Sequence, residues 1–118
     1  MSSFAGIYNI IADQGATFTR QLTWKDTDGS AINLTGYTAR MQLRSSVDAS
    51  GAAVLELTTE NNRIVLGGTA GTIDLSVSAA SMGSVTANTY VYDLELVSGA
   101  VVTRLVQGTF QVRAEVTR

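Results

Sequence analysis

Short segments in which apolar and polar residues alternate one by one make up most of this chain. The clearest is Thr89–Val97, where Tyr90, Tyr92, Leu94 and Leu96 share one parity and Asp93 and Glu95 the other. Successive side chains of a strand point to opposite faces, so a period of two indicates a strand with one buried side. Many such segments at short spacing predict an antiparallel β-domain.

The other segments follow the same pattern and are separated by Gly, Asn, Asp and Ser, residues that favour turns. Ser45–Ala52 is small and polar and is predicted to be a loop, and Ser78 can cap a helical turn near residues 78–83. Glu60–Asn62 predicts a hairpin turn between two neighbouring strands. The fold class is therefore all-β, a compact antiparallel β-sandwich, immunoglobulin-like or related, with at most one short helical turn. The predicted strands are residues 7–12, 17–25, 38–44, 54–58, 63–66, 72–78, 90–97, 101–107 and 109–117.

Length and composition bound the organisation of the chain. The 118 residues, 45% of them hydrophobic, suffice for one core, so we expect a single domain over 1–118 with residues 1–6 as an N-terminal arm. Without cysteine, no disulfide can form. The N-terminus does not resemble a secretory signal, and no apolar run reaches the roughly 20 residues that span a bilayer. We expect no membrane contact and synthesis in a cytoplasm.

Charge argues against nucleic acid as a partner. The net charge is −2, Lys25 is the only lysine, and the arginines are scattered along the sequence. Binding to a phosphate backbone normally requires a clustered basic face. We therefore expect no nucleic-acid partner.

Residue types also argue against catalysis. Histidine and cysteine are both absent, which removes the commonest nucleophiles, acid–base groups and transition-metal ligands. Asp93 and Glu95 could form a glycosidase pair, but Arg104 and Arg113 on later strands offer cross-strand partners, and a charge ladder is the better interpretation. We predict a protein that is not an enzyme, with no catalytic residue, metal site or cofactor.

Two short motifs are better read as loops than as ligand sites. Asp26–Gly29 resembles the first half of a calcium loop, but no acid follows at the required spacing, so a plain turn is preferred. Gly67–Thr72 is glycine-rich but lacks the phosphate-binding lysine and precedes a strand, not a helix. Neither motif predicts a site.

Aromatic and arginine residues give the candidate contact positions. Tyr90 is predicted to anchor a corner by bonding a nearby backbone group, as tyrosines do in immunoglobulin-like sandwiches, and Trp24 to pack in the core. Arg20 interrupts an apolar face, which suits a position at a sheet rim, a pairing with a buried acid, or a contact with a partner subunit. The candidate interface residues are Phe4, Tyr8, Arg20, Tyr37, Arg40 and Arg44.

The order of signatures resembles a family of small virion proteins of tailed bacteriophages, and is similar to the N-terminal domain of siphophage upper-baseplate and receptor-binding-protein adaptors. The resemblance implies a non-enzymatic β-sandwich that attaches to the virion, and it brings no catalytic residues. The segments that carry it are Tyr8–Ile10, Gln14–Phe18, Leu22–Gly29, Leu34–Arg44, Gly71–Ile73, Tyr90–Leu96 and Gly108–Arg118.

From this resemblance we expect a virion structural protein that docks in several copies on a symmetric assembly, as a tail or baseplate adaptor for fibres or spikes. Its partners would be other virion proteins and further copies of itself. Two alternatives stay open: a capsid decoration protein that bridges capsomers, and a carbohydrate-binding module that displays Tyr8 and Tyr37. Met1–Gly6 and Ser45–Ala52 are predicted to become ordered chiefly through contacts with other subunits.

Overall fold

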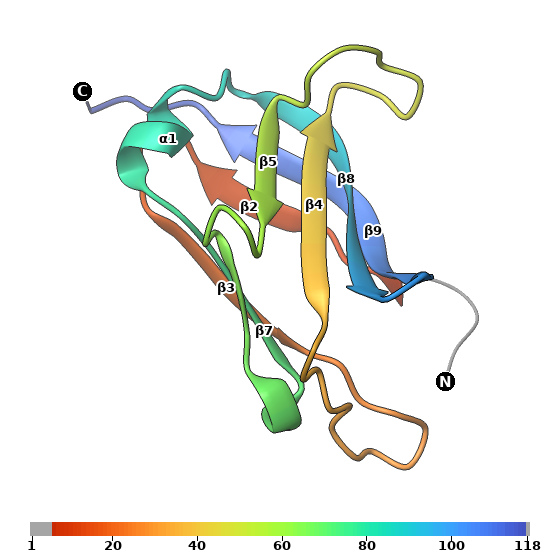
Figure 1. Cartoon of the computed structure of the whole chain (residues 1–118). Coiled ribbons are helices and arrows are strands. Elements are labelled where there is room, and N and C mark those ends of the chain that lie inside the picture. The colour runs from red at the N-terminus through yellow and green to blue at the C-terminus, as the bar shows by residue number, and fades with distance from the viewer. Residues whose placement is uncertain (1–5, 118) are drawn as a thin grey trace.

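The computed structural model describes residues 6–117 and arranges them as two facing β-sheets with one short α-helix at one end (Figure 1). The larger sheet, sheet A, has six strands and the smaller, sheet B, has three. Sheet A contains β1 (Gly6–Ile7), β2 (Ile10–Asp13), β4 (Thr38–Arg44), β5 (Leu55–Thr58), β8 (Asn88–Ser98) and β9 (Val101–Arg113); sheet B contains β3 (Phe18–Thr23), β6 (Ile64–Leu66) and β7 (Thr72–Val77).

The strand order confirms the predicted sandwich. Sheet A runs β1-β9-β8-β4-β5, with β2 also pairing with β9, and sheet B runs β3-β7-β6. This order matches the layers of an immunoglobulin variable-type domain, in which strands G, F, C and C′ face strands B, E and D. The prediction of a purely antiparallel arrangement needs one correction, because β1 and β2 lie parallel to β9.

The core lies between the two sheets and is apolar throughout. Ala39, Met41 and Leu43 of β4 are at most 1% exposed, as their shared parity predicts, and no polar or charged side chain among the described residues is buried. Phe18 of sheet B meets Phe110 of sheet A edge to face, with ring centroids 5.2 Å apart. Such aromatic pairs add to the stabilisation that burial alone provides.

One end of the sandwich is closed by α1 (Ala79–Gly83). Ser78 is its N-cap and accepts a hydrogen bond from the backbone N–H of Ser81, as predicted. Tyr90, early in β8, donates its hydroxyl to the carbonyl of Thr86, which confirms the predicted corner. A single turn of 3-10 helix, Gly68–Ala70, lies before β7 where the sequence predicts only a loop.

The predicted hairpin around Glu60–Asn62 is wrong, because β5 and β6 belong to different sheets. β5 pairs with β4, whereas β6 pairs with β7. The side chain of Asn61 organises the crossing: its oxygen accepts hydrogen bonds from the N–H groups of Thr58 and Arg63, and its amide nitrogen donates to the carbonyl of Glu56. The turn therefore passes the chain from sheet A to sheet B.

The sequence predicts that Gly108 separates two strands, but Gly108 lies within the single strand β9. A Cβ atom there would sit 2.6 Å from both the carbonyl oxygen of Tyr8 and Oδ1 of Asn9. Glycine allows this close approach of backbones. The predicted strand 7–12 is interrupted at the same place, since Tyr8 and Asn9 separate β1 from β2.

Candidate functional site

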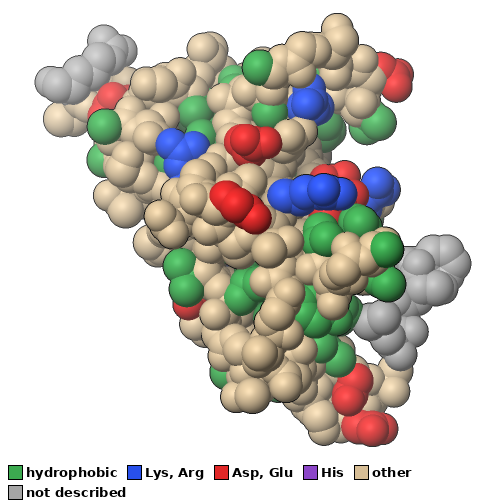
Figure 2. Space-filling model, viewed as in Figure 1, with side chains coloured by type: hydrophobic (Ala, Val, Ile, Leu, Met, Phe, Trp, Pro, Cys, Tyr) green, Lys and Arg blue, Asp and Glu red, His purple; other side chains and the backbone are tan. Residues whose placement is uncertain are grey.

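The outer face of sheet A carries a ladder of paired charges across three strands. Arg40 of β4 bonds Glu95 of β8 at 2.8 Å, and Arg104 of β9 lies 3.3 Å from Asp93 and 3.9 Å from Glu95. Arg104 thus takes the predicted cross-strand role. Figure 2 shows acidic and basic side chains gathered side by side over β4 and β5.

Two arginines have partners that the sequence analysis does not predict. Arg113 bonds Asp13 of β2 at 2.8 Å and takes no part in the ladder, so its predicted place there is wrong. This contact lowers the pKa of Asp13 and raises that of Arg113. Arg40, a candidate interface residue, is joined to Glu95 within its own chain.

Asp93 is the member of the ladder whose carboxyl pKa is raised above its ordinary value. Its partial burial raises the pKa of its carboxyl, and the neighbouring charge of Glu95 raises it further, while Arg104 and Arg40 oppose both effects. Losing hydration disfavours the ionised form, and the two cations favour it. The ladder therefore depends on keeping each carboxylate next to an arginine.

Beside the ladder lies an open hollow of about 620 Å³. The residues that line it include Arg44, Val91, Arg104, Gln107 and Thr109. Two apolar side chains on its rim face solvent, Ile7 at 70% and Val47 at 85% exposure. This hollow, with exposed apolar residues beside paired charges, is the candidate contact surface of sheet A.

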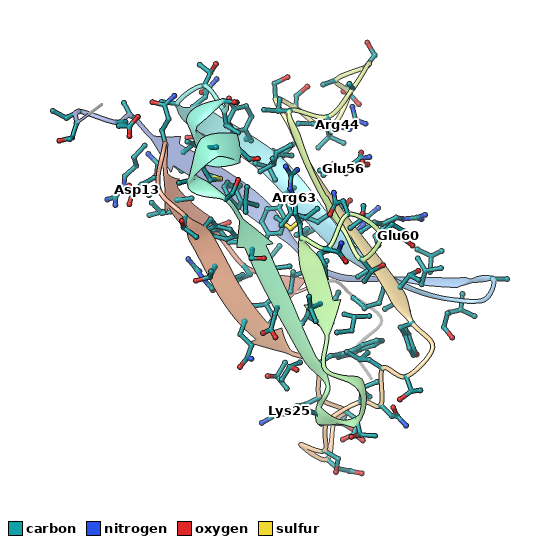
Figure 3. All side chains as sticks on the ribbon, turned by 60° about the vertical axis from the view of Figure 1, so that its left-hand side comes forward. Asp13, Lys25, Arg44, Glu56, Glu60 and Arg63 are labelled. Carbon is teal, nitrogen blue, oxygen red and sulfur yellow. The ribbon has the colours of Figure 1, made fainter. Side chains whose placement is uncertain are left out.

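Arg44 holds the Ser45–Ala52 loop that overhangs this hollow. Its Nη1 donates to the carbonyl of Gly51 at 2.8 Å, and its Nη2 donates to the amide oxygen of Gln42 at 2.9 Å. Gln42 in turn donates to Glu56 at 2.7 Å. Figure 3 shows Arg44 and Glu56 at one end of the molecule and Lys25 at the other. The loop thus has an anchor within its own chain, and its ordering by other subunits stays a prediction.

Tyr8 and Arg20, both candidate interface residues, meet between the sheets. Arg20 Nη1 donates to the hydroxyl of Tyr8 at 2.6 Å, and its guanidinium carbon lies 5.8 Å from the Tyr8 ring centroid and 5.6 Å from that of Phe18. The hydroxyl of Tyr92 donates to the carbonyl of Tyr8. Arg20 is therefore at the sheet rim, which is one of the three alternatives that the sequence suggests, and its hydrogen-bond partner is a tyrosine hydroxyl.

The remaining candidates do not form a displayed aromatic surface. Tyr37 is half-buried and packs edge to face on Trp24, which is 6% exposed, with centroids 6.0 Å apart. Phe4 lies outside the described residues. Ile7, Val47 and Gln107 line the hollow but are not among the candidates that the sequence predicts. One feature of the sequence could have indicated Ile7: it directly precedes Tyr8, and the alternation of the predicted strand 7–12 places its side chain on the outward face.

The Asp26–Gly29 motif is a turn, as predicted, whereas the Gly67–Thr72 motif contains the 3-10 turn Gly68–Ala70. One carboxylate oxygen of Asp26 accepts the N–H groups of Asp28 and Ser30, at 2.9 and 3.1 Å, which closes a turn upon itself. Gly67 precedes the 3-10 turn. Within residues 6–117 no three acidic, histidine or cysteine side chains cluster as metal ligands would. No helix in this part of the chain is long and apolar enough to cross a membrane.

Neither a protein-family model nor a curated protein matches the sequence. Among solved structures, 196 chains match. One is from a study of parallel homodimers of the extracellular domains of the voltage-gated sodium channel beta4 subunit, which relates them to cell–cell adhesion. Its likeness covers 98% of both chains at 14% identity with a TM-score of 0.46. A likeness this weak says nothing about what the present chain binds.

Proposed function

We propose that this chain is a non-enzymatic structural protein of a tailed-bacteriophage virion, and that it docks in several copies on a symmetric tail or baseplate assembly as an adaptor for fibres or spikes. The observation that carries the proposal is the outer face of sheet A. There an open hollow with an exposed apolar rim lies beside charges that are already paired. The order of sequence signatures along the chain supplies the virion context.

Because its charges are paired, covering this face costs less desolvation free energy than covering isolated charges would. An isolated buried charge loses its hydration at a cost of several kcal/mol, whereas a charge that retains an ion-pair partner recovers part of that loss. Arg40, Glu95, Arg104 and Asp93 retain one another when a partner excludes water. Ile7 and Val47 would supply apolar contact area at the rim. A surface of this kind suits docking better than chemistry.

Because several copies would dock on one particle, a weak contact by each copy would suffice for stable attachment. One hollow of about 620 Å³ offers a small contact area. On a symmetric particle, several copies bind at once, and linked sites raise the overall affinity well above that of one contact. The proposal therefore expects weak binding by the isolated chain and stable incorporation in the assembled particle.

The experiment is to locate the chain in purified particles by electron microscopy and to count its copies. A few to a few dozen copies at the tail would support the adaptor role. Hundreds on the capsid surface would support the decoration alternative and reject the tail placement. Absence from particles that were produced together with the chain would reject both.

A matched pair of variants tests the face itself. Ile7→Asp places a carboxylate at the hollow, whereas Ile11→Asp does so on β2 of the same sheet, outside the hollow, where Ile11 is 54% exposed. Incorporation should fall at least tenfold for Ile7→Asp and stay unchanged for Ile11→Asp. Equal losses would show that the hollow is not the docking surface.

The carbohydrate-binding alternative has less support. Tyr37 packs against Trp24, and the Tyr8 hydroxyl is occupied by Arg20. Neither ring is therefore a free stacking platform. Retention of the purified chain on host polysaccharide, lost in Ile7→Asp, would turn the proposal toward a glycan-binding role for the same hollow.

A further inference from the structure

The free edge of β3 is the longest uninterrupted open strand edge in the described part of the chain. β3 pairs only with β7 and spans six residues. The other edges are less suitable: β6 has three residues, β5 has four and carries exposed Glu56, and the β1–β2 edge is interrupted at Tyr8 and Asn9. An open edge offers unpaired backbone N–H and C=O groups to another strand.

The register of β3 shows which backbone groups face outward. The N–H of Trp24 donates to the carbonyl of Gly71, in line with the β3–β7 pairing of Leu22 with Ile73. Backbone groups alternate in direction along a strand, so those of the even-numbered residues face β7. Thr19, Gln21 and Thr23 therefore direct their N–H and C=O groups toward the free edge.

The usual guards of an edge are missing here. β3 contains no lysine, proline or bulge, and Thr19, Gln21 and Thr23 place exposed, uncharged side chains on its outer face. An inward-pointing charge can also guard an edge, and Arg20 has that orientation. Its guanidinium, however, is committed to the Tyr8 hydroxyl and lies near the Phe18 ring.

We infer that this edge pairs antiparallel with β3 of a second copy of the chain, about a two-fold axis at Gln21. This inference deepens the proposed function and rests on it, because it names the edge that another copy covers. In this register Gln21 lies opposite Gln21 and Thr19 opposite Thr23. All three outward residues of each strand are used, giving about six backbone hydrogen bonds.

The side chains of β3 are compatible with those of a second copy in this register but not in the neighbouring one. A two-fold axis one residue earlier would place Arg20 directly opposite Arg20, and like charges opposite each other are destabilising. With the axis at Gln21, Arg20 faces Leu22 of the other copy. The inner faces then meet through Phe18, Arg20 and Leu22, and the outer faces continue as rows of threonine and glutamine. The result is one continuous sheet of two β3-β7-β6 halves.

The test exploits the absence of cysteine from the chain. Opposed residues of a hydrogen-bonded pair have Cα atoms about 5.5 Å apart, within the range that a disulfide bridges. Purified Gln21→Cys should form a covalent dimer under mild oxidation. Thr19→Cys alone should not, because its copies would lie roughly 13 Å apart along the strands, four residues at ~3.3 Å each. A mixture of Thr19→Cys and Thr23→Cys should cross-link.

A charge variant supplies an independent measurement by sedimentation. The double variant Thr19→Lys, Thr23→Lys places ammonium groups opposite each other at both ends of the paired edge and should weaken dimerisation at least tenfold. Val65→Lys at the opposite edge of sheet B should leave it unchanged. Failure of Gln21→Cys to cross-link, or cross-linking of Thr19→Cys at the same rate, would overturn the inference. A dimer in solution together with absence from particles would reject the proposed function alone. Incorporation in particles without these cross-links would reject the pairing alone.

Discussion

Arg20 of sheet B donates a 2.6 Å hydrogen bond to the hydroxyl of Tyr8, which lies between two strands of sheet A. The carbonyl of the same tyrosine accepts the hydroxyl of Tyr92. Tyr8 is thus held at both its side chain and its backbone, at the point where β1 gives way to β2. The contact joins the two sheets on the side where both have a free edge.

Tyr8→Phe should lower the free energy of unfolding by about 1 kcal/mol, because the hydroxyl that accepts from Arg20 is lost while the guanidinium remains only partly solvated. Urea unfolding measures this. Arg20→Met in the Tyr8→Phe background should cost less than Arg20→Met alone, with a coupling of about 0.5 to 1.5 kcal/mol. Strictly additive losses would show that the two side chains do not stabilise each other.

Tyr92 should make stability depend on pH in the alkaline range. Burial raises the pKa of its hydroxyl from 10.0 to about 12, and the neighbouring Tyr8 adds to this, while Arg20 acts in the opposite direction. Between these values the unfolded chain loses the proton and the folded chain keeps it, so stability falls as pH rises. Below pH 10 both states are protonated and this contribution is constant.

Thermal unfolding of the wild type and of Tyr92→Phe across pH 8 to 12 isolates this effect, since other groups titrate equally in both proteins. The stability difference between them should be constant up to about pH 10 and then shift in favour of the variant. A difference that stays constant to pH 12 would contradict the raised pKa.

Gly108→Ala should destabilise the fold by about 1 to 3 kcal/mol, the usual cost of overpacking. The new Cβ would stand 2.6 Å from the backbone of Tyr8 and from the side chain of Asn9. Gly6→Ala on the neighbouring strand is the matched control, because its nearest contacts would be at ordinary distances of 3.7 and 3.8 Å. Equal effects of the two substitutions in denaturant unfolding would contradict the close approach.

Arg104→Met should raise the pKa of the Asp93 carboxyl further, because Arg104 is the foremost of the two cations that lower it. Carboxyl NMR titration of Asp93 reads this directly. Arg113→Met is the control and should leave the pKa of Asp93 unchanged, since Arg113 pairs with Asp13. An Asp93 pKa that is the same in wild type and Arg104→Met would show that the ladder is not coupled.

Local sequence patterns correctly predict those elements whose stabilising contacts are made by residues close together in the sequence. β4 begins and ends where the alternation of Ala39, Met41 and Leu43 does, and Ser78 caps a helical turn as its side chain allows. Tyr90 likewise finds its acceptor four residues away, at Thr86. In each case the decisive partner lies nearby in the sequence, so a short segment contains the necessary information.

Local alternation gives the wrong prediction where a contact with a segment distant in the sequence determines the structure. Glu60–Asn62 resembles a hairpin turn, but β4 takes β5 and β7 takes β6, and Asn61 lets the chain cross between them. Gly108 resembles a turn glycine, but the backbone of Tyr8, far away in the sequence, requires the missing side chain. Local alternation cannot show either relationship.

The candidate contact residues show the same limit. Arg40 and Arg44 point outward, as the alternation of the sequence predicts. The sequence does not show their partners: Arg40 donates a hydrogen bond to Glu95, and Arg44 donates one to the carbonyl of Gly51. The hollow could not be predicted, because it arises between β4, β9 and a loop that the sequence leaves without structure.

Pairing of β2 with β9 brings Ile10 beside Phe110 and Asp13 beside Arg113. Closing so long a loop has a large entropic cost, and topologies rich in distant contacts fold slowly. The ribosome must therefore have synthesised β9 before β2 can pair with it. Until then β2 has no partner strand, and during this period encounters with other nascent chains carry the greatest risk of aggregation.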